Sequence, residues 1–468
     1  MIPKAPLRTL RLLVLGAPLT IAAALCASGA PRTTALDEYV RRADSTYRYE
    51  LVSTLPGAGY TAYVLDMTSQ TWRKPDEVDR TAWRHWLTIL RPSRTSTSTA
   101  MLFITGGSLR DKPPAKPDSG LLEIALYTNS VVAELRMVPN QPLSFAGGRP
   151  LSEDDLIAHA WDKYLRTGDA GWLPRLPMTK SAVRAMDTVT AFCARLEGGA
   201  AAVDRFVVAG ASKRGWTTWT TAAVDRRVRA IAPIVIDLLN LEESFRHHWQ
   251  AYGFWAPAIK EYADYGIMDW MGTSPFRKLL DLVDPYSYRE RFTMPKFILN
   301  SAGDQFFLPD SSRFYFDGLP GEKCLRYVPN SDHSLRGSDA VASLAAWYDS
   351  LLRDVPRPRF SWKFEGGGAI RVLAQDQPKE VKLWQAVNSS RRDFRLESLG
   401  PAYKGSLLEQ KAPGVYLASP SVPETGWTAY FVELTFDTGR KHPLKLTTPV
   451  RVAPERLPYP PPRPGKPQ

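Results

Sequence analysis

Ser212 is the residue of this 468-residue chain whose surroundings most suggest nucleophilic chemistry. It lies in Gly210-Ala-Ser-Lys-Arg-Gly215, directly after the apolar run 206–209. A serine held at a tight strand-to-helix turn needs such small neighbours, because the strand and the helix approach each other closely. A strict G-x-S-x-G pattern would have glycine at position 214, where Arg214 stands, so the local pattern fits an ordinary helix N-cap equally well.

An acid and a histidine follow the serine in an order that favours the first interpretation. Asp304 comes shortly after the apolar run Phe297–Asn300, and His333 lies in the loop after the next apolar run. Serine, acid, histidine is the chain order of the α/β-hydrolases, in which the serine attacks, the histidine takes its proton and the acid holds the imidazolium. Asp237, at the end of another expected strand, is the alternative acid, whereas Asp332 fits better as a turn cap.

Two segments offer backbone N–H groups that could stabilise an oxyanion. One is the amide of Lys213, directly after the candidate nucleophile. The other is the loop after the apolar run Ala100–Thr105, where Gly106 and Gly107 let the backbone turn inward and Ser108 offers a further donor. A glycine turn after any strand would look the same, so this assignment depends on the rest of the pattern.

The elements that must position these residues are indicated by alternating apolar and amphipathic segments between residues 50 and 355. In the segment 338–352, for example, Val341, Leu344 and Tyr348 recur at helical spacing. The alternation predicts a doubly wound, mostly parallel sheet covered on both faces, with its chemistry at the carboxyl ends of the strands. The expected strands are Trp86–Leu90, Ala100–Thr105, Val131–Val138, Phe206–Ala209, Ala230–Ile236, Phe297–Asn300 and Leu325–Val328.

The pattern changes near Pro356. Short runs of period-2 character follow, and in the longest of them Tyr430, Val432 and Leu434 fall on one face. These runs predict a C-terminal all-β sandwich of immunoglobulin type over 356–458. They are Ser361–Phe364, Ala369–Ala374, Val381–Val387, Val415–Ala418, Trp427–Phe436 and Leu444–Val452.

Three further segments complete the expected organisation. Residues 1–30 combine an early cluster of basic residues, a short apolar run and a small-residue exit, as a cleaved export signal does, so the protein is expected in the periplasm or outside the cell. Residues 240–288 form an aromatic-rich insertion into the domain 31–355, either a lid or a subdomain with its own core. Residues 459–468 are a Pro-rich tail.

The composition excludes several classes of protein. Hydrophobic residues make up 44% and charged residues 23%, which is typical of globular proteins. The net charge of +12 is spread without a basic run, which argues against nucleic-acid binding, and no later segment is long enough to span a membrane. After removal of the signal, Cys193 and Cys324 remain, either paired or as buried thiols.

The histidines give no sign of a metal site. His247 and His248 are adjacent and therefore point in different directions on a helix, without further ligands on one face. The other histidines, apart from His333, are interpreted as structural. Hydrolysis through an activated serine needs no cofactor, so none is expected.

Several motifs together resemble one known family. Gly210-Ala-Ser-Lys-Arg-Gly-Trp-Thr-Thr-Trp219, Val228-Arg-Ala-Ile-Ala-Pro-Ile-Val-Ile-Asp-Leu-Leu-Asn240 and Pro329-Asn-Ser-Asp-His333 are similar to the PhoPQ-activated pathogenicity-related proteins, which include autocrine proliferation repressors. The likeness covers about residues 38–458. It implies a secreted α/β-hydrolase fold with the serine at Ser212, the acid at Asp304 and the histidine at His333.

The serine motif also resembles that of glucuronoyl esterases, in which a basic residue follows the serine. By this likeness Lys213 and Arg214 could clamp an anionic substrate or stabilise the oxyanion, and the alternative is that Arg214 only forms an ion pair on the surface. Trp216 is a further candidate for substrate contact. The interpretation favoured overall is an exported serine hydrolase of an ester or amide, small or attached to a polymer. The alternatives are a secreted signalling or binding protein with little turnover, and a carbohydrate-binding role for the β-sandwich.

Overall fold

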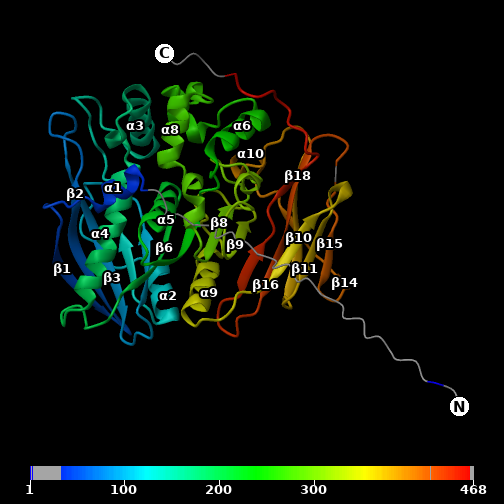
Figure 1. Ribbon diagram of the computed structural model, residues 1–468, viewed down its shortest axis with the longest axis horizontal. Coiled ribbons are helices and arrows are strands. Elements are labelled where there is room, and N and C mark those ends of the chain that lie inside the picture. Colours follow the sequence, from blue (N-terminus) through cyan, green and yellow to red (C-terminus); the bar gives the residue numbers. More distant parts are fainter. Residues whose placement is uncertain (2, 4–32, 422, 464–468) are drawn as a thin grey trace. The chain divides into compact units, whose positions relative to one another are not determined.

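A nine-stranded mixed sheet forms the centre of the computed structural model, which describes residues 1, 3, 33–421 and 423–463 (Figure 1). The strand order is β1-β2-β3-β5-β4-β6-β7-β8-β9. The six strands β5, β4, β6, β7, β8 and β9 run parallel to one another. The strands β1, β2 and β3 form an antiparallel extension, which the sequence predicted only in part. The strands are β1 (Arg48–Gly57), β2 (Tyr60–Thr71), β3 (Ala82–Pro92), β4 (Thr99–Ile104), β5 (Val132–Leu135), β6 (Arg205–Ala211), β7 (Val228–Ile234), β8 (Lys296–Ser301) and β9 (Lys323–Val328).

Helices cover both faces of this sheet. Successive side chains of a strand point to opposite faces, so β4 sends Leu102 to one hydrophobic cluster and Met101 to another. The first cluster includes apolar residues of α1 (Ala35–Arg41), α4 (Arg175–Cys193) and α5 (Lys213–Val224), and the second those of α2 (Ser119–Thr128) and α9 (Ala340–Leu352). The predicted doubly wound α/β-hydrolase fold is confirmed.

The predicted aromatic-rich insertion between β7 and β8 is helical. It contains α6 (Leu241–Tyr252), α7 (Lys260–Asp264) and α8 (Ser274–Val283). In Figure 1, α6 and α8 lie together with α3 (Glu153–Thr167) at the top of the view. Its aromatic residues include core members such as Phe276 and others that line the cavity at Ser212, so the insertion has a core and also faces the site.

Two antiparallel sheets form the C-terminal region, as predicted. One has the order β10-β11-β15-β14, and the other β13-β12-β16-β17 with β18 also paired to β16. The expected run 444–452 divides into two strands on either side of Thr448 and Pro449. A short helix, α10 (Leu396–Leu399), follows β12. The strands are β10 (Phe360–Phe364), β11 (Ile370–Ala374), β12 (Glu380–Asn388), β13 (Lys404–Leu407), β14 (Gln410–Ala412), β15 (Val415–Ala418), β16 (Trp427–Phe436), β17 (Leu444–Thr447) and β18 (Arg451–Ala453).

All ten residues of β16 are buried, because both of its faces are covered. Tyr430 and Val432 belong to the second cluster, which also includes residues of the other C-terminal sheet, whereas Phe431 belongs to the first cluster. Phe431 lies 6.2 Å from Tyr327 of β9 between ring centroids. The sequence alternation therefore marks two buried faces rather than one buried and one exposed face.

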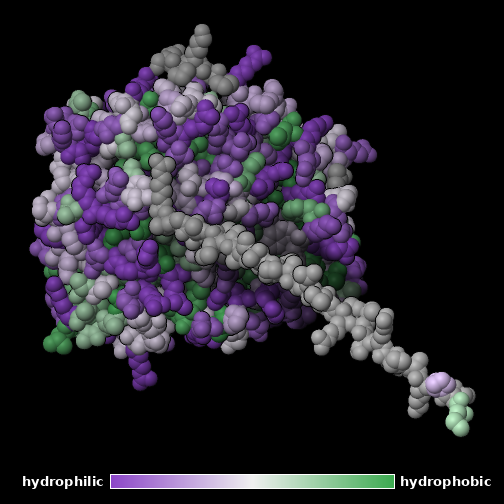
Figure 2. All heavy atoms as spheres, viewed as in Figure 1, coloured by the Kyte–Doolittle hydropathy of each residue, from purple (hydrophilic) through white to green (hydrophobic). Residues whose placement is uncertain are grey.

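The predicted domain boundary at 355/356 falls between α9 and β10, and the chain from Thr34 onward forms one compact unit. The predicted signal segment lies outside the described residues except for residues 1 and 3, as does the end of the predicted tail. No helix in the described ranges has the length and apolarity to cross a bilayer. On the face drawn in Figure 2, hydrophilic residues predominate and apolar ones occur in small groups.

Both described cysteines, Cys193 and Cys324, are free and buried. Burial raises the pKa of each thiol to about 12, so neither is a nucleophile at neutral pH. The structure therefore contains two buried thiols and not the disulfide that was the other alternative for these cysteines.

Candidate active site

Ser212 lies at a sharp turn between β6 and α5, in a conformation that side chains rarely adopt. Its φ is 57° and its ψ is −129°, and its side chain makes no capping hydrogen bond to the helix. Its amide donates to the carbonyl of Ile234 at 2.8 Å, which ties the turn to the end of β7. Such backbone strain costs on the order of 1–3 kcal/mol and is typical of functional sites. The geometry therefore favours a nucleophile elbow over the helix N-cap.

Two glycines permit this turn. A Cβ on Gly210 would lie 2.8 Å from the carbonyl oxygen of Arg214, and one on Gly215 would lie 2.8 Å from the carbonyl oxygen of Gly210. The close approach of helix to strand thus involves position 215 rather than 214, which explains why arginine is tolerated where the strict motif has glycine.

His333 and Asp304 are brought together at the same edge of the sheet. Nδ1 of His333 lies 2.8 Å from Oδ2 of Asp304, and the other carboxylate oxygen accepts from the amide of Phe306 at 2.8 Å. Asp304 is buried, and the ring of Phe306 lies 4.3 Å from the imidazole of His333. A proton on Nδ1 donated to Asp304 leaves Nε2 as the acceptor.

Ser212 lines a small cavity of about 30 Å³. Two residues in the walls of this cavity also contact His333. Phe306 and Phe307 belong to the walls, and both rings lie against His333. Nε2 of His333 is buried and has no hydrogen-bond partner in the described part of the chain, so no bond to Ser212 is formed. Hydrogen bonds of this kind are often long in unliganded enzymes and tighten when substrate binds.

Asp237, the alternative acid, is engaged elsewhere. Its two carboxylate oxygens accept hydrogen bonds from the hydroxyls of Tyr315, at 2.6 Å, and Tyr327, at 2.5 Å. Burial raises the pKa of Asp237 to about 7, although the two tyrosine bonds lower it. Because these bonds occupy both oxygens, the geometry favours Asp304 as the partner of His333.

The glycine loop after β4 holds two amides in a fixed direction. The carbonyl of Thr105 accepts from the amide of Val138 at 3.2 Å, and the carbonyl of Gly106 accepts from the amide of Met137 at 2.8 Å. In a trans peptide the N–H points opposite to the C=O, so the amides of Gly106 and Gly107 point away from residues 137–138. Neither amide donates a hydrogen bond to another described residue.

Of the two donors of Ser108, the backbone amide is occupied and only the hydroxyl proton remains to be donated. Its amide donates to Oδ2 of Asp111 at 2.9 Å, and its hydroxyl accepts from the amide of Arg110. The remaining predicted donor is the amide of Lys213, the first residue of α5, where backbone N–H groups have no partner within the helix.

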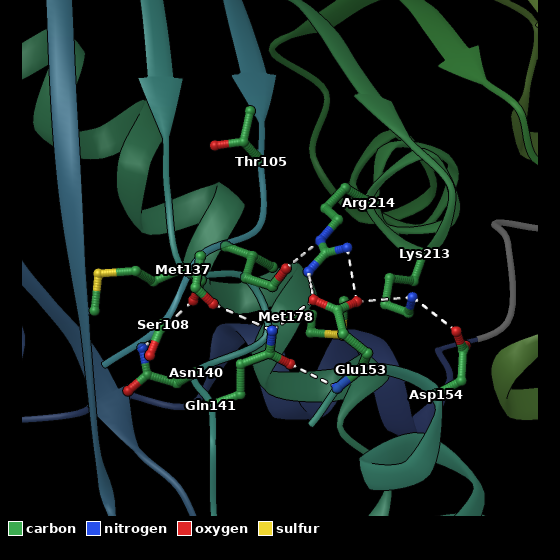
Figure 3. A network of polar contacts seen from close by, with 12 residues as sticks. Thr105, Ser108, Met137, Asn140, Gln141, Glu153, Asp154, Met178, Lys213 and Arg214 are labelled. Carbon is green, nitrogen blue, oxygen red and sulfur yellow. Dashed lines mark hydrogen bonds and ion pairs between the residues drawn. The ribbon is translucent and has the colours of Figure 1, made fainter. Parts of the chain in front are cut away.

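The side chains of Lys213 and Arg214 are part of an internal charge network, drawn in Figure 3. Arg214 forms a bidentate pair with Glu153, at 2.5 and 2.9 Å, and donates through Nε to the carbonyl of Val138 at 2.5 Å. Nζ of Lys213 lies 2.8 Å from Glu153 and 2.9 Å from Asp154. Burial alone would raise the pKa of Glu153, but the adjacent Lys213 and Arg214 outweigh it and hold the pKa at about 2.

The same network reaches the glycine loop through Gln141. Its amide nitrogen donates to the carbonyl of Gly107 at 3.1 Å and to Glu153 at 2.5 Å, and its carbonyl accepts from the amide of Glu153. The guanidinium of Arg214 packs so closely on Gly106 that a Cβ there would lie 2.6 Å from it. Glu153 and Asp154 thus pair with Lys213 and Arg214, while the buried guanidinium of Arg175 donates to the carbonyl of Lys213 at 2.7 Å as a third cation beside them.

Sequence reasoning missed Gln141, Glu153 and Asp154. The acidic start of α3, Glu153-Asp154-Asp155, was a visible signal, but acidic residues in the first turn of a helix need no other explanation than its dipole. Trp216, predicted to contact substrate, does line the cavity with Ser212, and its Nε1 donates to the carbonyl of Val283 at 2.5 Å.

His247 and His248 point in different directions, as predicted. Nε2 of His247 lies 3.0 Å from Oδ1 of Asp310, whereas Nε2 of His248 accepts from the amide of Ala256 at 3.0 Å. Within the described ranges, no cluster of three or more histidine, cysteine or acidic side chains is arranged to hold a metal ion.

A model of the PhoPQ-activated pathogenicity-related proteins matches residues 36–395 of the sequence. The chain belongs to this family. The match ends at Arg395, within the C-terminal region, whereas the resemblance noted from the motifs extends to about residue 458. Among relatives, the autocrine proliferation repressor protein A of Dictyostelium discoideum is 37% identical over 457 residues, which are 91% of this chain and 92% of that protein.

Solved structures of esterases share parts of the fold of this family member. Acetyl xylan esterase 1 from Thermoanaerobacterium sp. is 17% identical, with a TM-score of 0.47 over 68% of this chain and 93% of that one. A glucuronoyl esterase from Solibacter usitatus is 14% identical, with a TM-score of 0.36 over 62% and 83% of the two chains. At these values the functional argument depends on the site of this chain itself.

Proposed function

We propose that the protein is a serine hydrolase that cleaves an ester with a small acyl group. The observation that carries this proposal is the strained Ser212 at the end of β6, together with the His333–Asp304 pair on loops after β9 and β8. Because β6 through β9 are neighbours and run parallel, their carboxyl ends meet at one edge of the sheet.

In the proposed reaction, Nε2 of His333 accepts the hydroxyl proton as Oγ of Ser212 attacks the ester carbonyl. The tetrahedral intermediate collapses when the bond to the alcohol breaks, and His333 returns the proton to the leaving alkoxide. A water molecule then attacks the acyl-serine by the same route, so one ester and one water give one acid and one alcohol. Asp304 keeps the imidazole in the tautomer with the proton on Nδ1 and stabilises its charged form.

The developing oxyanion is proposed to be held by backbone amides rather than by basic side chains. The amides of Lys213, Gly106 and Gly107 have no acceptor among the described residues, and the carbonyl preceding each of them accepts a backbone hydrogen bond. The side chains of Lys213 and Arg214 are paired with Glu153 and Asp154, so their contribution is to hold the elbow and the glycine loop in position.

The cavity at Ser212 limits the acyl group. Its volume of about 30 Å³ is little more than the space of one water molecule. Its walls are largely aromatic, with Trp161, Trp216, Tyr262, Phe306 and Phe307 among them. A short apolar acyl group such as acetyl fits this space, whereas a long chain requires the walls to move.

Labelling with a fluorophosphonate probe tests the proposal, because the probe reacts only with an activated serine. The purified wild-type chain should be labelled, and the variants Ser212→Ala and His333→Ala should not. Ser93→Ala, at an exposed serine after β3, is the matched control and should be labelled as the wild type is. A folded wild-type chain that resists the probe would contradict the proposal.

A signalling or binding role with little turnover is the second candidate, and two observations favour it. Nε2 of His333 is not bonded to Ser212 in the structure, and the 37% identical relative carries the name of a proliferation repressor. Retention of binding activity by the unlabelled Ser212→Ala variant would support this role instead.

We also propose that the protein is exported, since residues 1–30 have the composition of a cleaved signal. N-terminal sequencing of the protein recovered from outside the cytoplasm tests this. A mature N-terminus close to residues 27–31 is expected, and an N-terminus at Met1 would contradict it.

A further inference from the structure

A second and larger cavity, of about 270 Å³, lies between α2 and α9 on the face of the main sheet that these helices cover. Its floor consists of apolar residues at the ends of the central strands, including Phe103, Ile234 and Leu299. Its rim includes Val341, which the helical spacing of α9 predicted to be buried but which is 43% exposed. A hollow that reaches the middle strands at their carboxyl ends is where α/β proteins bind ligands.

Three residues of its lining are chain neighbours of the proposed catalytic groups. Ala211 precedes Ser212, Ser334 follows His333, and Thr105 precedes Gly106 of the glycine loop. Consecutive Cα atoms are about 3.8 Å apart, so at each of these three places the lining of the cavity is one residue away from a proposed catalytic residue. The cavity that contains Ser212 has none of these three in its walls, so the two hollows are distinct.

The charged groups of the lining are acidic. Asp118 is exposed and its Oδ1 accepts from the amide of Leu121, which caps α2. Glu134 is buried and accepts from the hydroxyl of Thr105 at 3.0 Å and from Nε of Arg136 at 3.2 Å. None of the lining residues, all of which belong to the described ranges, is a lysine, an arginine or a histidine.

We propose that this cavity binds the alcohol portion of the ester and selects uncharged or cationic alcohols over anionic ones. The inference rests on the proposed hydrolase function. A substrate whose carbonyl lies at Ser212 has its acyl group in the small cavity, and the alcohol, which receives its proton from His333, extends past Ser334 into the larger one. An anionic alcohol would be brought close to two carboxylates, of which Glu134 is paired with Arg136 and Asp118 has no cation beside it in the lining.

The size of the site is tested with two acetates, methyl acetate and 3,3-dimethylbutyl acetate. Val341→Trp fills the rim, so its kcat/KM for 3,3-dimethylbutyl acetate should fall about tenfold more than its kcat/KM for methyl acetate. Leu126→Trp is the matched control, because Leu126 is 39% exposed on α2 but outside the lining. The control should leave the ratio of the two kcat/KM values as it is in the wild type.

The charge preference is tested with 3,3-dimethylbutyl acetate and its analogue in which one terminal methyl is replaced by a carboxylate. The wild type should prefer the neutral ester by about tenfold or more, and the double variant Asp118→Asn with Glu134→Gln should bring the ratio close to one. Both substitutions keep the hydrogen-bond acceptors and remove the charges. High salt should weaken the preference of the wild type, since Asp118 is exposed.

The outcomes separate the two proposals. If the wild type hydrolyses neither methyl acetate nor the bulkier ester and resists the fluorophosphonate, the hydrolase function is wrong and the inference falls with it. If both esters are hydrolysed but Val341→Trp lowers both rates equally, and the double variant leaves the charge preference unchanged, only the assignment of this cavity is overturned.

Discussion

His333 and Asp304 meet through Nδ1 and Oδ2 at 2.8 Å, at the ends of two loops that follow neighbouring parallel strands. The other acid at this edge, Asp237, is bound by two tyrosine hydroxyls. The two carboxylates thus have different surroundings and, in our interpretation, different roles. Asp304 orients a base, and Asp237 ties together three elements of the fold.

This difference predicts opposite results for two conservative variants. Asp304→Asn should lower kcat for a small ester by about 10³–10⁴-fold, because the amide stabilises the wrong histidine tautomer. Asp237→Asn should change kcat less than tenfold, since its carboxylate does not contact His333. Steady-state hydrolysis of methyl acetate at pH 7 measures both. A larger loss in Asp237→Asn than in Asp304→Asn would assign the roles the other way round.

Arg214 is expected to act as a positioning residue through the glycine loop. Arg214→Ala removes the bidentate pair with Glu153 and the bond to Val138, so the oxyanion donors lose their support. A misplacement of about 1 Å can cost about 10²-fold in rate, so kcat should fall to that extent while KM changes little. Arg214→Lys should not restore kcat, because an ammonium cannot form the planar fork.

Two comparisons make this prediction specific. Arg149→Ala removes an exposed pair with Asp155 elsewhere on α3 and should leave kcat unchanged. Acidic and neutral esters should be affected equally by Arg214→Ala. If instead KM rises mainly for acidic esters, Arg214 binds an anionic substrate, as the likeness to glucuronoyl esterases suggested.

The sequence was sufficient for the parts of the site that depend on local pattern and chain order. The elbow at Ser212, the strands that end near Asp304 and His333, and the glycine loop each have a signature within about ten residues. The order of these segments along a doubly wound sheet then brings them to one edge, because parallel strands align their carboxyl ends. Both predicted sheets of the C-terminal region follow from period-2 alternation in the same way.

What the sequence could not supply are partners distant in the chain. The likeness to glucuronoyl esterases assigns Arg214 to substrate, and nothing local in the sequence indicates that it pairs with Glu153, 61 residues earlier. Asp237 resembled Asp304 at the end of a strand until Tyr315 and Tyr327 proved to bind it from positions 78 and 90 residues later. Pairing of this kind is set by tertiary packing, which leaves no periodic trace in one sequence.

Trp161 is expected to limit the length of the acyl group. It is buried in the wall of the small cavity, edge-on to Tyr262 at 5.3 Å and to Trp216 at 6.0 Å between ring centroids. Trp161→Phe should enlarge the cavity and raise kcat/KM for a hexanoate relative to an acetate of the same alcohol by about tenfold. Trp347→Phe is the control, because Trp347 is also buried but packs on Phe297 outside this cavity. An equal rise of the hexanoate-to-acetate ratio in Trp347→Phe would mean that looser packing in general, and not the wall of this cavity, causes the effect.

Asp237 should make stability depend on pH in an unusual direction. Burial raises its pKa from 3.8 to about 7, so the folded protein retains a proton that the unfolded chain loses above pH 4. The free energy of unfolding should therefore fall as the pH rises from about 4 to 7 and level off above that range. Urea unfolding of wild type and Asp237→Asn at pH 5 and pH 7.5 isolates this effect. The variant should gain stability relative to the wild type at the higher pH, and a pH-independent difference would contradict the assignment.

The buried ion pair between Arg326 of β9 and Glu433 of β16 is expected to join the two regions of the chain into one cooperative unit. Both side chains are almost fully buried, and Arg326 also donates to Asp339 at 2.9 Å. Glu433→Ala leaves the guanidinium partly unpaired in the interior, which should lower the free energy of unfolding by about 3–5 kcal/mol. Without the main sheet, the isolated segment 356–458 should fail to fold. A test of the carbohydrate-binding role considered for the β-sandwich should therefore measure polysaccharide binding by the whole chain.

Urea unfolding followed by tryptophan fluorescence measures this loss. Glu365→Ala is the matched control, because its pair with Arg371 is exposed and such pairs contribute about 0–1 kcal/mol. The wild type should unfold in one transition, since the two faces of β16 belong to clusters that both include residues of the main sheet. Two separate transitions, with Glu433→Ala as mild as Glu365→Ala, would mean that the C-terminal sheets are an independent domain.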